Sequence, residues 1–204
     1  LGVPSKRIRG DAYFELIEEF VAAVQDAYPR ALIQFEDFLT PNAYKLLNEY
    51  RDRVLCFNDD IQGTASVALA GVYAANRITG ADLADQTILF LGAGSAATGI
   101  ADLMTQARLR RGMSEGEARQ KLWLVDSKGL VVGSRETLRE HSAPYAHDHD
   151  PLTFMGALEK LKPNVLIGAT GRPGTFTKEA VEAMCALNDR PIIFPYSNPT
   201  SHFC

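Results

Sequence analysis

The sequence has no long hydrophobic run, few cysteines and no strong excess of either charge. No apolar stretch approaches the roughly 20 residues of a membrane-spanning helix, so no membrane partner is expected. A formal net charge of −4 offers no basic surface for nucleic acid. The cysteines Cys56, Cys185 and Cys204 lack metal-ligand or CxxC spacing. We therefore expect a soluble protein in a reducing compartment. The cytoplasm, the mitochondrion and the plastid all fit this expectation.

The sequence also has no biased tract and no initiator methionine. It is 46% hydrophobic and 23% charged, which is typical of a globular protein. Its 204 residues suit one large or two small domains. Because it starts at Leu1 and stops at Cys204, just beyond an expected strand, we expect an internal fragment of a longer protein.

Short apolar segments alternate with helical patterns along the whole chain. Strands are predicted at residues 31–35, 54–57, 86–91, 121–125, 165–167 and 192–195. Helices are predicted at residues 13–27, 40–51, 64–78, 95–110, 153–161 and 177–187, with Thr40 and Pro41 as the cap and first position of the second. Strands that are apolar throughout and alternate with helices predict an α/β fold with a doubly wound parallel sheet.

Acidic pairs follow the first two expected strands. Glu36 and Asp37 follow the first strand, and Asp59 and Asp60 follow the second. Strands joined by a crossover helix run parallel, so these carboxylates should converge at one sheet edge, where α/β proteins bind ligands. Oxygen donors without cysteine suit Mg2+ or Mn2+. The alternative is that the acids are helix caps or a solvated rim.

A glycine-rich loop, GAGSAA at residues 92–97, joins an expected strand to an expected helix. Gly92 permits a tight turn, Gly94 allows a pyrophosphate to approach the backbone, and Ala97 allows close helix packing. The N–H groups and positive dipole end of the helix would face the phosphates. A glycine turn that serves packing alone is the alternative, and dinucleotide binding is the better explanation.

Asp126 ends the next expected strand, where an acid can accept hydrogen bonds from a ribose. It lies beyond the usual spacing of about 20 residues, which we attribute to a long preceding helix and a turn at residues 112–116. Its carboxylate would repel the 2′-phosphate of NADP, which favours the binding of NAD. Because Ser127, Lys128 and Arg135 could offset that charge, we favour NADP slightly over NAD.

Two groups of polar residues are expected to lie in solvated surface positions rather than in functional sites. We expect His141, His147 and His149 to lie in a solvated loop rather than in a transition-metal site. The basic residues of the region are expected on helix surfaces, because no aromatic residues interleave them as in nucleic-acid sites; they are Arg108, Arg110, Arg111, Arg119 and Lys121.

Several motifs, in order along the chain, resemble those of the malic enzymes. They are RIRG (7–10), FEDF (35–38), FNDDIQGTASVALAG (57–71), LGAGSAATGIA (91–101), VDSKGL (125–130) and IIFPYSNPTS (192–201). The resemblance covers essentially the whole chain, and FNDDIQGT is highly specific. It implies that residues 1–60 are the end of the family's metal- and substrate-binding domain and residues 61–204 its Rossmann-like NAD(P)-binding domain.

The resemblance implies oxidative decarboxylation of L-malate to pyruvate and CO2 with reduction of NAD(P)+. It places a divalent metal on Glu36, Asp37 and Asp60, a catalytic acid at Asp59, and a contact to the malate carboxylate at Asn198. It assigns the dinucleotide to Gly92, Gly94, Ser95, Ala96, Asp126 and Ser127. It also implies a homodimer or homotetramer for the full-length protein.

The chain departs from the family's pattern in two respects. It offers no match for the family's tyrosine and lysine acid–base pair, so we expect little activity from these residues alone. Residues 202–204 also differ from the family's continuation after SNPTS. Two other hypotheses remain, a non-catalytic dinucleotide-binding module and a magnesium-dependent phosphohydrolase with Asp59 or Asp60 as nucleophile.

Overall fold

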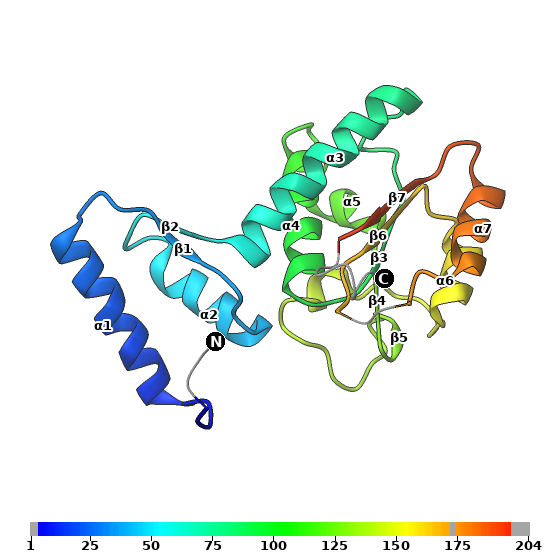
Figure 1. Ribbon diagram of the computed structural model, residues 1–204. Helices are drawn as coiled ribbons and strands as arrows, with labels where there is room; N and C mark the ends of the chain where they lie inside the picture. The colour runs from blue at the N-terminus through cyan, green and yellow to red at the C-terminus, as the bar shows by residue number, and fades with distance from the viewer. Residues whose placement is uncertain (1–3, 172–173, 197–204) are drawn as a thin grey trace.

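The computed structural model describes residues 4–171 and 174–196, which form a small N-terminal unit and a larger α/β unit (Figure 1). The small unit consists of α1 (Asp11–Ala27), β1 (Ile33–Phe35), α2 (Thr40–Tyr50) and β2 (Cys56–Asn58). A π-helical turn, η1 (Asp59–Gly63), leads into α3 (Thr64–Thr79), which runs from the small unit to the larger one. Within the described residues, no helix combines the length and hydropathy needed to cross a membrane.

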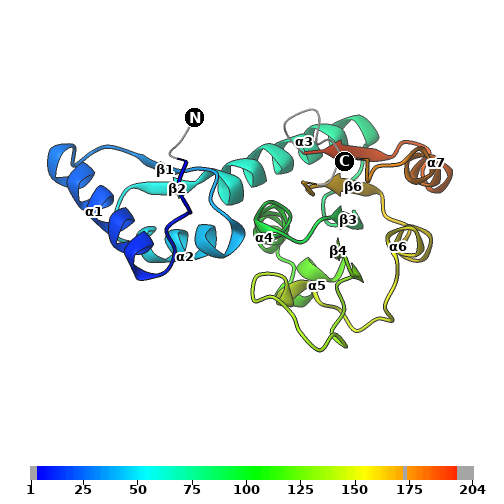
Figure 2. The same cartoon turned by 60° about the horizontal axis from the view of Figure 1, so that its bottom comes forward.

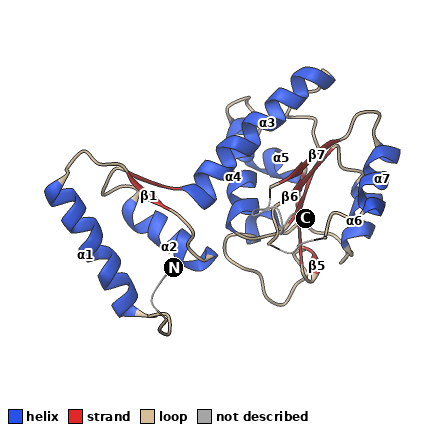
Figure 3. Cartoon of the chain, in the orientation of Figure 1, coloured by secondary structure: helices blue, strands red, loops and turns tan. Residues whose placement is uncertain are grey.

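The larger unit alternates strands and helices, as Figure 3 shows in red and blue. Its strands are β3 (Ile88–Leu91), β4 (Leu122–Asp126), β5 (Gly129–Leu130), β6 (Val165–Gly168) and β7 (Ile192–Pro195). Its helices are α4 (Ser95–Leu109), α5 (Glu115–Gln120), the 3-10 turn η2 (Ala143–Tyr145), α6 (Phe154–Leu161) and α7 (Lys178–Leu187). The predicted elements thus form close to their expected positions.

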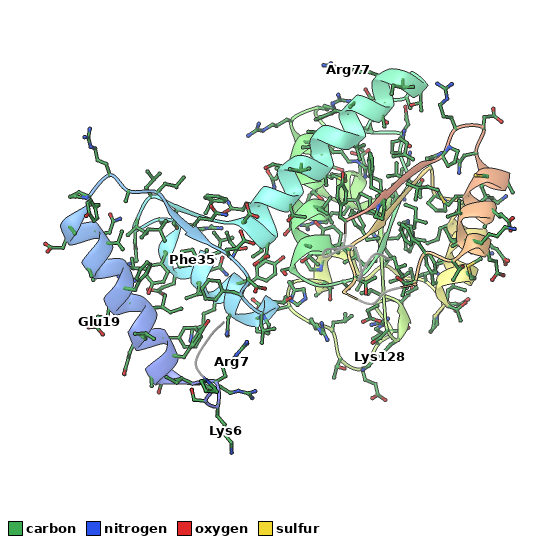
Figure 4. The ribbon with its side chains drawn as sticks, viewed as in Figure 1. Lys6, Arg7, Glu19, Phe35, Arg77 and Lys128 are labelled. Carbon is green, nitrogen blue, oxygen red and sulfur yellow. The ribbon has the colours of Figure 1, made fainter. Side chains whose placement is uncertain are left out.

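The small unit is built on one parallel strand pair. β1 pairs with β2 so that Phe35 lies opposite Asn58, and the residues that follow each strand therefore leave the same end of the pair. Phe35 is buried and stacks on Tyr50 of α2 at 5.6 Å between ring centroids (Figure 4). Val21 of α1 and Leu46 of α2 complete this core.

The larger unit is a doubly wound sheet with strand order β5-β4-β3-β6-β7, parallel except for the short β5. Alternate residues of β3 point to opposite faces, as a strand requires. Ile88 and Phe90 pack in the core that includes residues of α3 and α4, whereas Leu89 and Leu91 pack in the core that includes residues of α6 and α7. Figure 2 shows these helix pairs on the two sides of the sheet.

Two local predictions were wrong. Residues 115–120 form α5, a helix that was not predicted and that takes in the end of the turn expected at 112–116. The signal was present, because Ser114 and Glu117 make a reciprocal capping box. Thr40 is the first residue of α2 rather than its cap, which is Leu39. The strands β1 and β2, which precede the larger unit, form a sheet of their own, separate from the five-stranded sheet.

Candidate functional site

The acids Asp59 and Asp60 lie in the first turn of η1, directly after β2. Asn58 caps this turn, because its buried side-chain Oδ1 accepts a hydrogen bond from the Ile61 N–H at 2.9 Å. Gly63 ends the turn, and a Cβ there would overlap the Asp59 carboxylate. The π-helical form thus places two neighbouring acids at the start of a helical segment, where its dipole favours negative charge.

The second acidic pair lies on the segment that follows β1 and is tied to the first. Asp60 accepts a hydrogen bond from the Phe38 N–H at 3.3 Å. Asp37, which precedes Phe38, has a left-handed backbone with φ 58°. Non-glycine residues rarely adopt this conformation outside turns and functional sites. Glu36 accepts a hydrogen bond from the Gln34 amide at 2.9 Å. The parallel pairing of β1 and β2 therefore brings both acidic pairs to one edge.

The acids share an electrostatic environment. Partial desolvation raises the pKa of Glu36, and the nearby charges of Asp59 and Asp60 raise it further, against the Gln34 hydrogen bond. Burial also raises the pKa of Asp60, against its backbone hydrogen bonds. Across the part of the chain that the structure describes, no three acidic, histidine or cysteine side chains are grouped closely enough to enclose a metal ion. The donor set still fits a hard cation, since all its donors are oxygens and a cation would relieve their mutual repulsion.

The glycine-rich loop connects β3 to α4. Gly92 has φ 130°, and a Cβ there would overlap the backbone carbonyl of Ala169, so only glycine fits. A Cβ on Gly94 would meet Thr40 Oγ1 at an ordinary 3.6 Å, so packing within the protein does not require this glycine. Ser95 and Ala96 form the first turn of α4. Gly94 thus leaves room for a group outside the chain to approach the loop.

The acidic turn packs on the helix that the glycine-rich loop begins. Gly99 of α4 lies against the backbone of Ile61 in η1. At the start of the same helix, the Ser95 N–H donates to Thr40 Oγ1 of α2 at 3.3 Å. The carboxylates and the loop are therefore neighbouring parts of one site.

Asp126 at the end of β4 is engaged by Arg135. The guanidinium donates to both carboxylate oxygens, Nη1 to Oδ2 at 2.7 Å and Nη2 to Oδ1 at 2.9 Å. The Lys128 N–H also donates to Oδ1 at 2.8 Å. Burial alone would raise the pKa of Asp126, but these hydrogen bonds and the Arg135 charge hold it below its usual range. The carboxylate is therefore ionised and largely neutralised by its partner.

Comparison with known proteins decides the family. Residues 61–204 match the family described as "Malic enzyme, NAD binding domain", and residues 1–51 match "Malic enzyme, N-terminal domain". This chain belongs to the malic enzyme family. The larger match covers the sheet, the glycine-rich loop and Asp126. The malic enzyme motifs within the described residues therefore lie on the fold that the resemblance implied.

Curated malic enzymes from plants and animals are similar over nearly all of the chain. The chloroplastic NADP-dependent malic enzyme of Zea mays is 53% identical over 99% of this chain and 32% of its own length. The NADP-dependent malic enzyme of Rattus norvegicus is 50% identical over 98% of this chain and 36% of its own length. The chain thus spans about a third of the length of these curated relatives.

A crystal structure of Entamoeba histolytica malic enzyme shares the fold. It superposes with a TM-score of 0.73 at 27% identity, over 93% of this chain and 38% of that one. Both the small unit and the doubly wound sheet must contribute to an alignment of that extent. The α/β architecture is therefore that of solved malic enzymes.

Several residues near the site of this malic enzyme chain were missed or misplaced by the sequence analysis. Thr40, Tyr44 and His141 contact the loop or the start of α4, and no motif marks them. His141 was expected to be solvated but is half-buried against Tyr44. Away from the site, His147 is half-buried against Trp123 rather than solvated, and Arg108 is fully buried rather than on a surface. Asn198, the expected malate contact, lies outside the described residues.

Proposed function

We propose that this chain carries the metal and dinucleotide sites of an enzyme that converts L-malate to pyruvate and CO2 while reducing NAD(P)+. One observation carries the proposal. The acidic turn η1 packs directly on α4, whose first residues form the glycine-rich loop, in a chain of the malic enzyme family. A cation held by the acids and a dinucleotide held by the loop would then lie next to each other.

The acids Glu36, Asp37 and Asp60 would hold Mg2+ or Mn2+. A bound divalent cation supplies Lewis-acid polarisation of substrate oxygens. The support lies in the all-oxygen donor set, the left-handed Asp37 and the raised pKa values of Glu36 and Asp60. Asp59, in the same turn as Asp60, is the candidate to hold or move a proton, because its carboxylate is close enough to influence Glu36.

The dinucleotide would bind along Gly92, Gly94, Ser95 and Ala96, with Asp126 and Ser127 at its ribose. We favour NADP slightly over NAD, for two reasons. The Asp126–Arg135 pair reduces the repulsion that a lone carboxylate would exert on a 2′-phosphate. The relatives from Zea mays and Rattus norvegicus are named as NADP-dependent. Asn198 would contact the malate carboxylate.

The division at residues 60 and 61 separates the end of the metal- and substrate-binding domain from the dinucleotide-binding domain. Because the chain matches about a third of its relatives, we propose that turnover requires a longer polypeptide that supplies the tyrosine and lysine pair. That polypeptide would be a homodimer or homotetramer. For the 204 residues alone we expect binding without appreciable turnover.

Two measurements test the proposal. Calorimetry should show Mn2+ binding by the chain, weakened on the order of 100-fold or more in Asp60→Asn, since even the outer partners of metal ligands contribute about 10–100-fold. Asp52→Asn, at an exposed acid in the turn after α2, is the matched control and should bind Mn2+ normally. Unchanged Mn2+ affinity in Asp60→Asn would remove this acid from the metal site.

Turnover is tested in a polypeptide of the relatives' full length. Malate should drive NADPH or NADH formation only when Mn2+ or Mg2+ is present. A metal-dependent release of phosphate from p-nitrophenyl phosphate, without malate-driven reduction of a dinucleotide, would instead indicate the phosphohydrolase. Dinucleotide binding with neither activity would indicate a non-catalytic module.

A further inference from the structure

The glycine-rich loop is held by side chains that lie outside its motif. Tyr44 belongs to α2 of the small unit, and His141 precedes η2 in the larger unit. Their rings stack with centroids 5.3 Å apart and planes inclined by 10°. Each ring is hydrogen-bonded to the loop or to the first turn of α4. The two rings thus form a clamp across the boundary between the units.

The Tyr44 branch of the clamp reaches the carbonyl of Gly94. Thr98 Oγ1 donates to Gly94 O at 2.8 Å and lies 2.5 Å from the Tyr44 hydroxyl. A threonine hydroxyl has one hydrogen, so when Thr98 donates it to Gly94 O the Tyr44 hydroxyl is the donor between the two side chains. Gly94 O also accepts the Thr98 N–H at 3.0 Å. Burial raises the pKa of Tyr44 to about 12, so this donor stays protonated at neutral pH.

The His141 branch reaches the carbonyl of Ala93. His141 Nε2 lies 3.2 Å from Ala93 O. A carbonyl oxygen can only accept a hydrogen bond, so Nε2 carries a hydrogen and donates it. The two branches therefore hold the carbonyls of two consecutive residues, Ala93 and Gly94.

Holding these carbonyls also orients the N–H groups of the loop. In a planar trans peptide the N–H points opposite the C=O of the preceding residue. Fixing Ala93 O therefore fixes the direction of the Gly94 N–H, and fixing Gly94 O fixes that of the Ser95 N–H. The Ser95 N–H already donates to Thr40 Oγ1, so the Gly94 N–H is the group that the clamp directs toward a phosphate at the start of α4.

The clamp lines a cleft beside the loop. Tyr44, His141 and Thr40 line a cleft of about 1060 Å³ between α2 and residues 139–141. Thr40 Oγ1 in turn accepts a hydrogen bond from the Ser95 N–H. The wall of this cleft is thus continuous with the backbone groups that would meet a pyrophosphate.

We propose that Tyr44 and His141 are positioning residues for the dinucleotide, which fix the Ala93 and Gly94 carbonyls, and with them the Gly94 N–H, before the pyrophosphate binds. The inference rests on the proposed dinucleotide site. A pre-oriented loop needs no ordering when the ligand arrives, which increases affinity. Since the clamp acts on groups that face the pyrophosphate, it should affect NADP+, NAD+ and ADP alike.

Calorimetric titration of the 204-residue chain tests the clamp. His141→Phe keeps an aromatic ring for stacking but loses the N–H donor, and Tyr44→Phe loses the hydroxyl alone. Each substitution should weaken the binding of NADP+, NAD+ and ADP by about 3- to 10-fold, which is the effect of losing one hydrogen bond. His141→Gln restores an N–H donor and should bind within about 2-fold of the wild type. His149→Phe, whose histidine lies beside Trp123, is the control and should bind normally.

The outcomes separate the two proposals. If the wild-type chain binds none of the three ligands, the proposed dinucleotide site fails and the clamp fails with it. If the wild type binds and His141→Phe and Tyr44→Phe bind equally well, the clamp alone is refuted. If His141→Gln is as weak as His141→Phe, donation to Ala93 is not what His141 contributes. Thermal midpoints of all variants within a few degrees of the wild type would show that the fold is retained.

Discussion

Gly99 in α4 lies against the carbonyl oxygen of Ile61 in η1, so closely that a Cβ at position 99 would come within 2.5 Å of that oxygen. The neighbouring group is backbone and cannot rotate away as a side chain could. The absence of a side chain at residue 99 thus sets how near the acidic turn lies to the helix of the glycine-rich loop. This contact joins the acidic turn to the helix that begins with the glycine-rich loop.

Gly99→Ala should therefore destabilise the chain by about 1–3 kcal/mol, because the added methyl forces α4 and η1 apart. Urea unfolding followed by the fluorescence of Trp123, the single tryptophan, measures this change. Gly116→Ala in α5 is the control, since a Cβ there meets nothing within 4 Å, and it should stabilise by about 0.5–1 kcal/mol. Equal stability of the two variants would contradict the tight approach.

Arg108 should be essential for the stability of the fold. It lies far from the acidic residues in sequence. Its fully buried guanidinium donates to the carbonyls of Leu83, Gln86 and Ala118. Arg108→Met would leave these carbonyls without their donor and should cost about 3 kcal/mol or more of unfolding free energy. Arg110→Met, an exposed position on the same helix end, should change it by less than about 0.5 kcal/mol. A small effect at Arg108 would mean that water replaces the guanidinium.

Arg135 should support NADP+ binding more than NAD+ binding. Without the guanidinium, Asp126 would face a 2′-phosphate as an uncompensated negative charge. A charge-assisted hydrogen bond contributes about 1.5–3 kcal/mol, so Arg135→Met should weaken NADP+ by roughly 10- to 100-fold and NAD+ by much less. Arg77→Met, toward the far end of α3 (Figure 4), is the control. Calorimetry with both dinucleotides gives the ratio, and an equal loss for both would refute this role.

Stability should fall as the pH drops below 6.5, in part because of His147. Burial lowers the pKa of His147 from 6.5, although its hydrogen bond to Leu122 O at 2.8 Å opposes the shift. Below pH 6.5 the unfolded chain takes up a proton that the folded chain does not, so unfolding becomes more favourable. The slope from one such group cannot exceed about 1.4 kcal/mol per pH unit. Urea unfolding between pH 5.5 and 7.5 gives the slope of the unfolding free energy against pH. This slope should be smaller in His147→Gln, and an unchanged slope would contradict the contribution of His147.

Local sequence patterns were sufficient for most of the fold. The apolar runs at 86–91, 121–125 and 192–195 are strands because both faces of the sheet are covered, and such strands need no alternation. Thr153 and Thr177 cap α6 and α7 through their side chains. The capping box of α5 was overlooked because Gly112 and Gly116 suggested a turn, although an exposed six-residue helix tolerates a glycine.

The site was only partly predictable from the sequence. The two acidic pairs and the glycine-rich loop are contiguous motifs, and local rules recognise them. Tyr44 and His141 are 97 positions apart and belong to no motif, yet their rings stack beside the loop. His147 was misjudged because polar neighbours in sequence suggested solvent, whereas in space its ring lies against Trp123, at 4.2 Å between ring centroids. Contacts between distant residues leave no periodicity for sequence analysis to detect.

The sequence by itself determined the α/β alternation, the acidic pairs after the first two strands and the glycine-rich loop before α4. These features depend on hydrophobic periodicity and on the backbone freedom of single residues, which act locally. Only the tertiary structure decided that Gly99 brings the acidic turn onto α4, that Arg135 is the candidate whose side chain pairs with Asp126, and that Tyr44 and His141 hold the loop. The contacts of Gly99, Tyr44 and His141 arise from packing between segments that the chain separates by many residues, and packing exists only after the chain has folded.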